Sequence, residues 1–130
     1  MVIWGNEKMM TTPELASRYY ALMLENKRAQ IVDELYAQDI VCKEPEHAIA
    51  MGISTITVGL EAVKAKAKAR AAMVAEIHGD YCSEPLIAGH FFSVVLGRDL
   101  TLKGKPRMSL QEIGVFEVKD GKIVTEQFFY

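Results

Sequence analysis

The side chains of this sequence that could transfer protons are glutamates and tyrosines placed beside predicted strands and an apolar helix face. Glu44 stands directly before Pro45, at the end of a short β-branched segment, where a carboxylate would overhang the mouth of a cavity. Apolar surroundings raise the pKa of a glutamate toward the range of a general base. The alternative interpretation is a solvated carboxylate at the end of a strand.

Tyr20 is a second candidate, because it lies on the flank of the apolar face of the first predicted helix. A buried phenol usually needs a partner for its O–H group. That partner is either an oxygen of a substrate or a backbone carbonyl, and the sequence leaves both open.

The last predicted hairpin decides whether two further carboxylates share one face of the sheet. If residues 119–121 form a three-residue loop with a bulge at Gly121, Lys122 pairs with Val118. A two-residue turn at residues 120–121 shifts the register by one, which moves Glu126 to the opposite face from Glu112.

We favour the three-residue loop, in which Gly114 pairs with Glu126 and Glu112 pairs with Phe128. The residues that then share one face are Glu112, Phe116, Glu126, Phe128 and Tyr130. Two carboxylates in an apolar setting do not both ionise readily, so one should hold a proton and could donate it to a developing oxyanion. The alternative is that this face is exposed or buried in a dimer contact.

The elements that must position these residues change from helix to strand near residue 75. Helices are predicted over about 11–26, 28–37 and 58–74, with a short strand at 40–44. Strands are predicted over about 76–83, 86–97, 106–118 and 122–130. The predicted fold is α+β, with three N-terminal helices packed on a curved antiparallel sheet to form a cone with an internal pocket. One domain spans residues 1–130, with residues 1–10 as an N-terminal extension.

Metal and cofactor sites are not predicted. The histidines His47, His78 and His90 lack the spacing of metal ligands, and His78 with Asp80 on one strand face makes only two ligands. No glycine-rich phosphate loop follows a strand. The basic residues of the third predicted helix are expected to face solvent, and they are Lys64, Lys66, Lys68 and Arg70.

Composition narrows the class of protein. The chain has 130 residues, 50% of them hydrophobic, which suits one globular domain. Its 15 basic and 17 acidic residues give a net charge of −2, which argues against a nucleic-acid partner. No apolar run approaches the ~20 residues of a membrane helix, and no signal peptide is evident. We expect a cytoplasmic protein in which Cys42 and Cys82 are free thiols.

The ending DGKIVTEQFFY resembles the nuclear transport factor two-like superfamily. Within it the chain is most similar to SnoaL-like proteins, the group that contains polyketide cyclases, and to ketosteroid isomerases, over roughly residues 12–130. The stretch RYYALMLENKRAQIVDELYAQDIVCKEP is similar to the corresponding isomerase segment without a gap. In that overlay Tyr20 matches the oxyanion-binding tyrosine of the family, and Glu44 matches its catalytic aspartate.

A third family position departs from the pattern. Isomerases carry a protonated aspartate on the penultimate strand, and SnoaL-like cyclases also use an acidic residue there. The nearest positions here are Ile113 and Gly114, neither of which can donate a proton. Glu112, two residues before Gly114, could reach the pocket in its place, helped by Glu126.

The resemblance implies isomerisation, cyclisation or hydration of a largely apolar, carbonyl-containing substrate. Glu44 would remove a proton, and Tyr20 with Glu112 or Glu126 would bind the oxygen. A second hypothesis is a binding protein for a small apolar or amphipathic ligand, with Phe116, Phe128 and Tyr130 as walls.

A third hypothesis is an association module with a vestigial pocket. The resemblance implies a homodimer through the outer face of the sheet in every case. Residues that could supply that contact, or equally the core, are Val94, Leu96, Ile113 and Val115.

Overall fold

The computed structural model describes residues 9–130, so most of the expected N-terminal extension lies outside the described residues. The helices are α1 (Thr12–Leu24), α2 (Arg28–Leu35), α3 (Leu60–Ala72) and the short 3-10 helix η1 (Glu46–Met51). The strands are β1 (Tyr36–Lys43), β2 (Ile56–Val58), β3 (Val74–Cys82), β4 (Leu86–Ala88), β5 (Phe91–Leu102), β6 (Arg107–Lys119) and β7 (Lys122–Phe129). None of the helices in residues 9–130 is long and apolar enough to cross a membrane.

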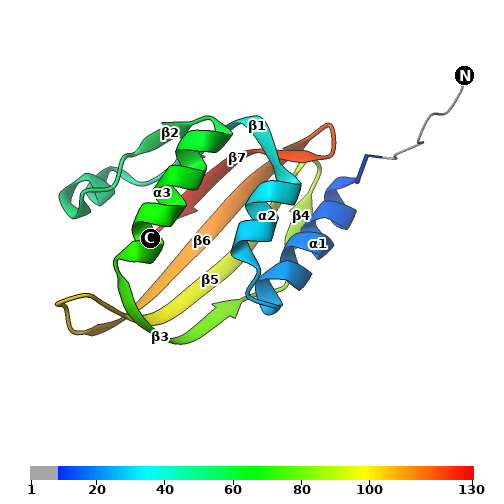
Figure 1. Cartoon of the computed structure of the whole chain (residues 1–130). Helices are drawn as coiled ribbons and strands as arrows, with labels where there is room; N and C mark the ends of the chain where they lie inside the picture. The colour runs from blue at the N-terminus through cyan, green and yellow to red at the C-terminus, as the bar shows by residue number, and fades with distance from the viewer. Residues whose placement is uncertain (1–8) are drawn as a thin grey trace, which may run out of the picture.

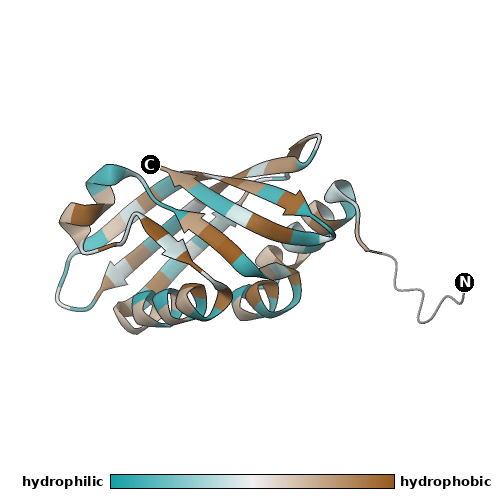
Figure 2. Cartoon of the chain, turned by 90° about the horizontal axis from the view of Figure 1, so that it is seen from above, coloured by the Kyte–Doolittle hydropathy of each residue, from teal (hydrophilic) through white to brown (hydrophobic). Residues whose placement is uncertain are grey.

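The strands form one sheet in the order β2-β1-β7-β6-β5-β3, and β4 pairs with β5 at the side. The three α-helices lie on one side of this sheet (Figures 1 and 2), so the α+β prediction of helices on a curved sheet is confirmed. The sheet is mixed and open rather than wholly antiparallel, because β1 runs parallel to β7. Parallel pairing needs a long crossover, and the chain from η1 to β6 supplies one.

Local sequence signals account for α1. The side chain of Thr11 accepts a hydrogen bond from the Glu14 amide at 3.3 Å, and the Glu14 carboxylate accepts one from the Thr11 amide at 2.9 Å. This capping box and Pro13 in the first turn satisfy or remove free N–H groups at the start of the helix. The residues that α1 buries at helical spacing include Leu15, Tyr19 and Leu22, so Tyr19 lies at the centre of the stripe that faces the sheet.

The second helix ends earlier than predicted. It stops at Leu35, and Tyr36 adopts extended backbone angles and opens β1. The sequence predicted helix through residue 37, because Tyr36 continues the apolar spacing of Ile31 and Leu35. Pairing of Tyr36 with Ile123 of β7 overrides that weak helical preference.

The last hairpin differs from the favoured prediction at its turn. Asp120 and Gly121 have φ angles of 51° and 73°, and Lys119 pairs directly with Lys122 across them. Two consecutive residues with positive φ make a two-residue turn whose twist matches that of the strands it joins. The predicted three-residue loop, with Lys122 opposite Val118, is therefore wrong.

A β-bulge in the same hairpin restores the predicted face. Val118 pairs with Ile123, but Glu117 pairs with Thr125, so Val124 is the extra residue. Beyond this bulge Phe116 pairs with Glu126, instead of the predicted Gly114 with Glu126.

Gly114 pairs with Phe128, so the predicted pairing of Glu112 with Phe128 is also shifted by two residues. A shift of two leaves every side chain on the same face, because side chains alternate along a strand. Glu112 and Glu126 therefore share a face as predicted.

Aromatic rings form part of the hydrophobic core on this same face of the sheet. Phe116 is fully buried, and the centroid of its ring lies 4.8 Å from that of Phe92 and 4.9 Å from that of Tyr19. A Cβ atom at Gly114 would come within 3.0 Å of the Phe116 ring and 3.3 Å of the Phe128 ring. The two rings thus occupy the space that a side chain at position 114 would need.

The structure also shows whether the two cysteines and the alternating apolar strand residues are buried or exposed. Cys42 and Cys82 are free and buried, as predicted. Val94 and Leu96 belong to the core, whereas Ile113 is exposed on the other face of the sheet.

Replacing Phe116 with alanine should lower the free energy of unfolding by about 3–5 kcal/mol, because it empties a fully buried ring site. Urea denaturation measures the change. Leu24→Ala is the control, since Leu24 at the end of α1 is 62% exposed, and it should change the free energy of unfolding by less than about 1 kcal/mol. Equal losses in both variants would contradict the described core.

Candidate functional site

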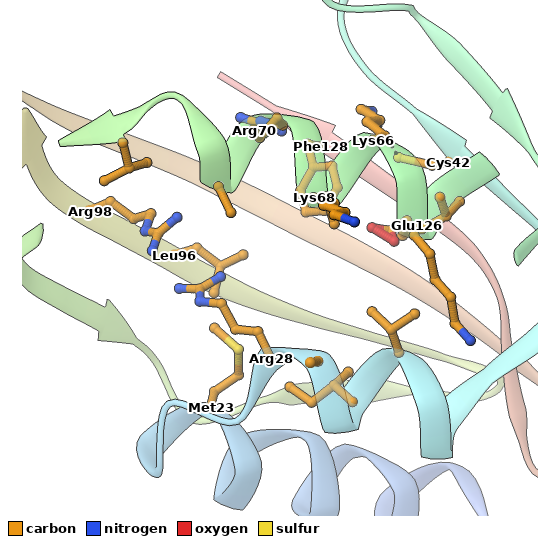
Figure 3. A pocket seen from close by; sticks show the side chains of 18 of the residues that line it. Met23, Arg28, Cys42, Lys66, Lys68, Arg70, Leu96, Arg98, Glu126 and Phe128 are labelled. Atoms are coloured by element: carbon orange, nitrogen blue, oxygen red, sulfur yellow. Dashed lines mark hydrogen bonds between the residues drawn. The ribbon is translucent and has the colours of Figure 1, made fainter. Parts of the chain in front are cut away.

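A cavity of about 870 Å³ lies between the helices and the sheet. Figure 3 shows side chains from both layers lining it, and the volume is in the range typical of small-molecule sites. Apolar lining residues include Met23, Val32, Val63, Leu96 and Phe128. Exposed residues of α3 and β3 also line it, among them Lys68 and Ile77, so the cavity opens to solvent beside these two elements.

Glu126 of β7 is a buried carboxyl group that lines this cavity. Its side chain lies opposite Phe116, the residue is only 5% exposed, and Oε2 has no hydrogen-bond partner among the described residues. Burial raises the pKa of Glu126 to about 7, and the charges of Glu44 and Glu112 add to the rise. A hydrogen bond from Tyr36 and the charge of Lys66 oppose it. This carboxyl can therefore both accept and release a proton near neutral pH.

Glu44 follows β1 and also lines the cavity, but its oxygens are already engaged. Lys66 Nζ lies 2.9 Å from Oε2, and the Tyr130 hydroxyl donates to Oε1 at 2.8 Å. Arg70 Nη1 approaches Oε2 at 3.8 Å. The Glu44 carboxylate therefore acts as the centre of an ion-pair and hydrogen-bond cluster.

The basic row of α3 does not form the single solvated face that the sequence predicted. Residues two apart on an α-helix point in nearly opposite directions, so the row divides into two sides. Lys64 pairs with Asp33 of α2 at 3.2 Å, whereas Lys66 and Arg70 turn toward Glu44. The Lys66 side chain is only 17% exposed, and its Nζ also lies 3.4 Å from Cys42 Sγ.

Tyr19, rather than Tyr20, presents its side chain to the cavity. Tyr20 is half-buried against the core and is not among the lining residues, and its predicted role stays untested. No hydrogen bond joins the Tyr19 hydroxyl to another residue of 9–130. Burial raises the pKa of Tyr19 well above its ordinary value, so the phenol stays protonated and can donate. The centre of the α1 apolar stripe is the sequence signal for this residue.

Glu112 lines the cavity from the neighbouring strand β6, four residues along from Phe116, which pairs with Glu126. Burial raises its pKa, and the charges of Arg70, Arg28 and Arg98 oppose that rise. The predicted carboxylates Glu44, Glu112 and Glu126 are therefore brought together in one hollow.

Of the three aromatic residues predicted as walls of the cavity, one lines it and two do not. Phe128 lines the cavity, whereas Phe116 lies behind it in the core and is not a wall. Tyr130 is not among the lining residues either, and it acts on the cavity only through its hydrogen bond to Glu44. Its ring also meets His47 edge-on at 5.3 Å between centroids.

No group of three or more His, Cys, Asp or Glu side chains within residues 9–130 is arranged to hold a metal ion. His78 instead contacts Glu76 and Thr101, each at 2.8 Å.

A family model described as a SnoaL-like domain matches residues 10–130 of the chain. A protein from Mesorhizobium loti, provisionally described as a SnoaL-like polyketide cyclase, is 29% identical with a TM-score of 0.85, and the match covers 93% of this chain and 100% of that one. TerC, co-crystallised with polyporic acid, is 16% identical with a TM-score of 0.73, covering 92% and 90%. No curated protein matches the sequence.

A third solved structure is a protein from Catenulispora acidiphila with a ketosteroid isomerase-like fold, in complex with trimethylamine. It is 20% identical with a TM-score of 0.69, and the match covers 92% of this chain and 87% of that one. At this identity the likeness concerns the fold alone.

The raised pKa of Glu126 predicts how stability depends on pH. The folded protein binds this proton more tightly than the unfolded chain, whose glutamate has a pKa of 4.5, so stability should fall as pH rises from 4.5 to about 7. The fall should be roughly 3 kcal/mol. Urea denaturation of the wild type and of Glu126→Gln from pH 4.5 to about 7 gives the free energy of unfolding of each as a function of pH. The pH-dependent difference between these two free energies is the contribution of Glu126. A difference that does not change with pH would contradict the assignment.

Proposed function

The chain belongs to the SnoaL-like domain family, and from that membership and the chemistry of its cavity we propose that it is a small-molecule enzyme. It uses general acid–base chemistry at a carbon next to a carbonyl group of a substrate with a large apolar part. The reaction class is isomerisation, cyclisation or hydration without a cofactor. The polyketide cyclase description of the 29% identical relative supports this class.

The observation that carries the proposal is the state of Glu126. A carboxyl with one unpartnered buried oxygen and a pKa of about 7, placed in a largely apolar cavity, has the properties of a general base at neutral pH. Glu44, the base that the sequence analysis predicted, is the weaker candidate, because Lys66 and Tyr130 occupy its oxygens. We assign Glu44 to positioning Lys66 instead.

The proposed mechanism moves one proton within the cavity. Glu126 takes a proton from the carbon beside the carbonyl, and the electron pair of that C–H bond passes to the carbonyl oxygen. The Tyr19 hydroxyl donates a hydrogen bond to that oxygen as its charge develops. Where the substrate carries a β,γ double bond, the product of this step is a dienolate, and Glu126 returns the proton to its γ-carbon, which completes an isomerisation. In a cyclisation the enolate carbon attacks a second carbonyl, and that oxygen takes the proton.

Glu126→Gln should reduce catalysis by about 10²–10⁴, because glutamine cannot accept the proton. Exchange of α-protons for deuterium in a panel of apolar ketones, followed by proton NMR, measures the reaction without knowledge of the natural substrate. Tyr19→Phe should reduce the rate by about 10²–10³ through loss of the oxyanion donor. Tyr81→Phe is the control, since Tyr81 is 60% exposed and does not line the cavity.

Glu44→Gln separates the two candidate bases. Loss of exchange in Glu44→Gln with exchange retained in Glu126→Gln would reverse the assignment. Saturable binding of ketones by the wild type with no exchange at all would identify a binding protein instead of an enzyme.

We also propose that the chain forms a homodimer through the outer face of its sheet. Val95 pairs with Ile113, and Ile113 pairs with Phe129, so the three side chains form a continuous row across β5, β6 and β7. All three are large, apolar and at least 40% exposed in the single chain. A second copy would remove this row from water.

Ile113→Lys should give a monomer at micromolar concentration, because it places a charge at the centre of the apolar row. Sedimentation velocity distinguishes monomer from dimer. Leu24→Lys, at an exposed position at the end of α1 and away from the outer face of the sheet, should leave the dimer intact. A wild-type chain that sediments as a monomer would rule out this interface.

A further inference from the structure

Three arginines line the cavity, and we propose that they bind a carboxylate group of the ligand. They are Arg28 of α2, Arg70 of α3 and Arg98 of β5, and all three line the cavity. The inference rests on the proposed function in one respect, because it assumes that the ligand of this cavity is also the substrate of Glu126. It defines the substrate class as an oxo carboxylic acid.

Arg28 and Arg98 share one carboxylate partner, Asp80. Arg98 donates through Nε to Asp80 Oδ1 at 2.9 Å, whereas Arg28 Nη2 only approaches the same oxygen at 3.9 Å. No other ion pair or hydrogen bond involves either guanidinium among residues 9–130. Most of their N–H donors are therefore available to a ligand.

The guanidinium groups of Arg28 and Arg98 lie at the same end of the cavity. Figure 3 shows Arg28 reaching up from the helix layer and Arg98 reaching from the sheet, at one end of the cavity. Their side chains are 37% and 28% exposed, so the charges are partly shielded from water yet still accessible. Charges in such a position attract an anion more strongly than charges on an open surface.

The local charge balance favours a monoanion. Three arginines face the carboxylates of Asp80 and Glu112, which leaves an excess of one positive charge, or of two when Glu112 is protonated. Lys64 and Lys66 pair with Asp33 and Glu44, and the positive charge of Lys68, which also lines the cavity, is offset in this sum by the carboxylate of Glu76. A carboxylate fits the planar donor fork of an arginine and carries the single charge that this balance can accept.

The rest of the cavity defines the other half of the ligand. In Figure 3 Glu126 lies at the end of the cavity away from Arg28 and Arg98, and the labelled apolar side chains include Leu96 and Phe128. A ligand with its carboxylate at the arginines can therefore place an apolar body along these walls and a carbonyl near Glu126. The arginines would act in binding and orientation rather than in proton transfer.

The test uses matched probes that differ only in charge: benzoylpropionate, benzoylbutyrate and their methyl esters. At low salt the wild type should bind at least one of the acids about tenfold more tightly than its ester, as measured by calorimetric titration. The double variant Arg28→Gln/Arg98→Gln should weaken binding of the acid about tenfold and leave the ester unchanged. Arg107→Gln is the control, because Arg107 pairs with Asp99 and does not line the cavity.

Equal binding of acid and ester by the wild type would overturn the inference, and so would the absence of saturable binding by either acid. An equal loss of both probes in a double variant that still unfolds at the wild-type temperature would also overturn it. α-Proton exchange of the same probes separates this inference from the proposed function. If the esters exchange as readily as the acids, only the carboxylate site is ruled out. If the acids bind tightly but do not exchange, only the catalytic role of Glu126 is ruled out.

Discussion

The free-energy penalty of burying the Glu126 carboxylate organises the site of this protein. An ionised carboxylate in an apolar hollow is strongly unfavourable unless donors or cations compensate it. Here the compensation is partial: Tyr36 supplies one hydrogen bond and Lys66 a nearby charge, while one oxygen stays unpartnered. The proton is therefore held weakly enough to leave and strongly enough to return. Glu44, by contrast, has a partner at each of its two oxygens.

The fold was predictable where the signals were local. A threonine cap before Pro13 and the helical spacing of Leu15, Tyr19 and Leu22 predicted a helix over about 11–26, and α1 spans Thr12–Leu24. The turn at residues 120–121 was located correctly, but its type was not, because the bulge at Val124 compensates for it from a distance of three residues. The two-residue turn and the bulge each shift the predicted register by one residue. Together they shift it by two, which leaves Glu126 on the predicted face. The parallel pairing of β1 with β7 joins residues far apart in the chain, and no local pattern reports it.

The candidate site was predictable in its carboxylates but not in its cations. Strand alternation brought Glu112 and Glu126 to one face, and a strand end placed Glu44 at the cavity. The ion pair of Lys66 with Glu44 depends on how α3 is rotated against β1, which the sequence shows only as a row of basic residues. The phenol that lines the cavity is Tyr19, at the centre of the apolar stripe, whereas the family overlay indicated Tyr20, whose role stays a prediction.

The attachment of α3 has a consequence for how a molecule enters. Its buried apolar side chains, Leu60 and Val63, both lie in the first half of the helix. Farther along, the Lys66 contact with Glu44 is the short link to the strands, and the exposed side chains that follow it add little packing. The chain is held again only where Met73 accepts a hydrogen bond from Lys103 and Val74 pairs with Leu102. A thinly packed segment between two anchored ends opens by local fluctuation more readily than one packed along its whole length. The second half of α3 is thus where thermal breathing would widen the passage, with the rest of the scaffold left undisturbed.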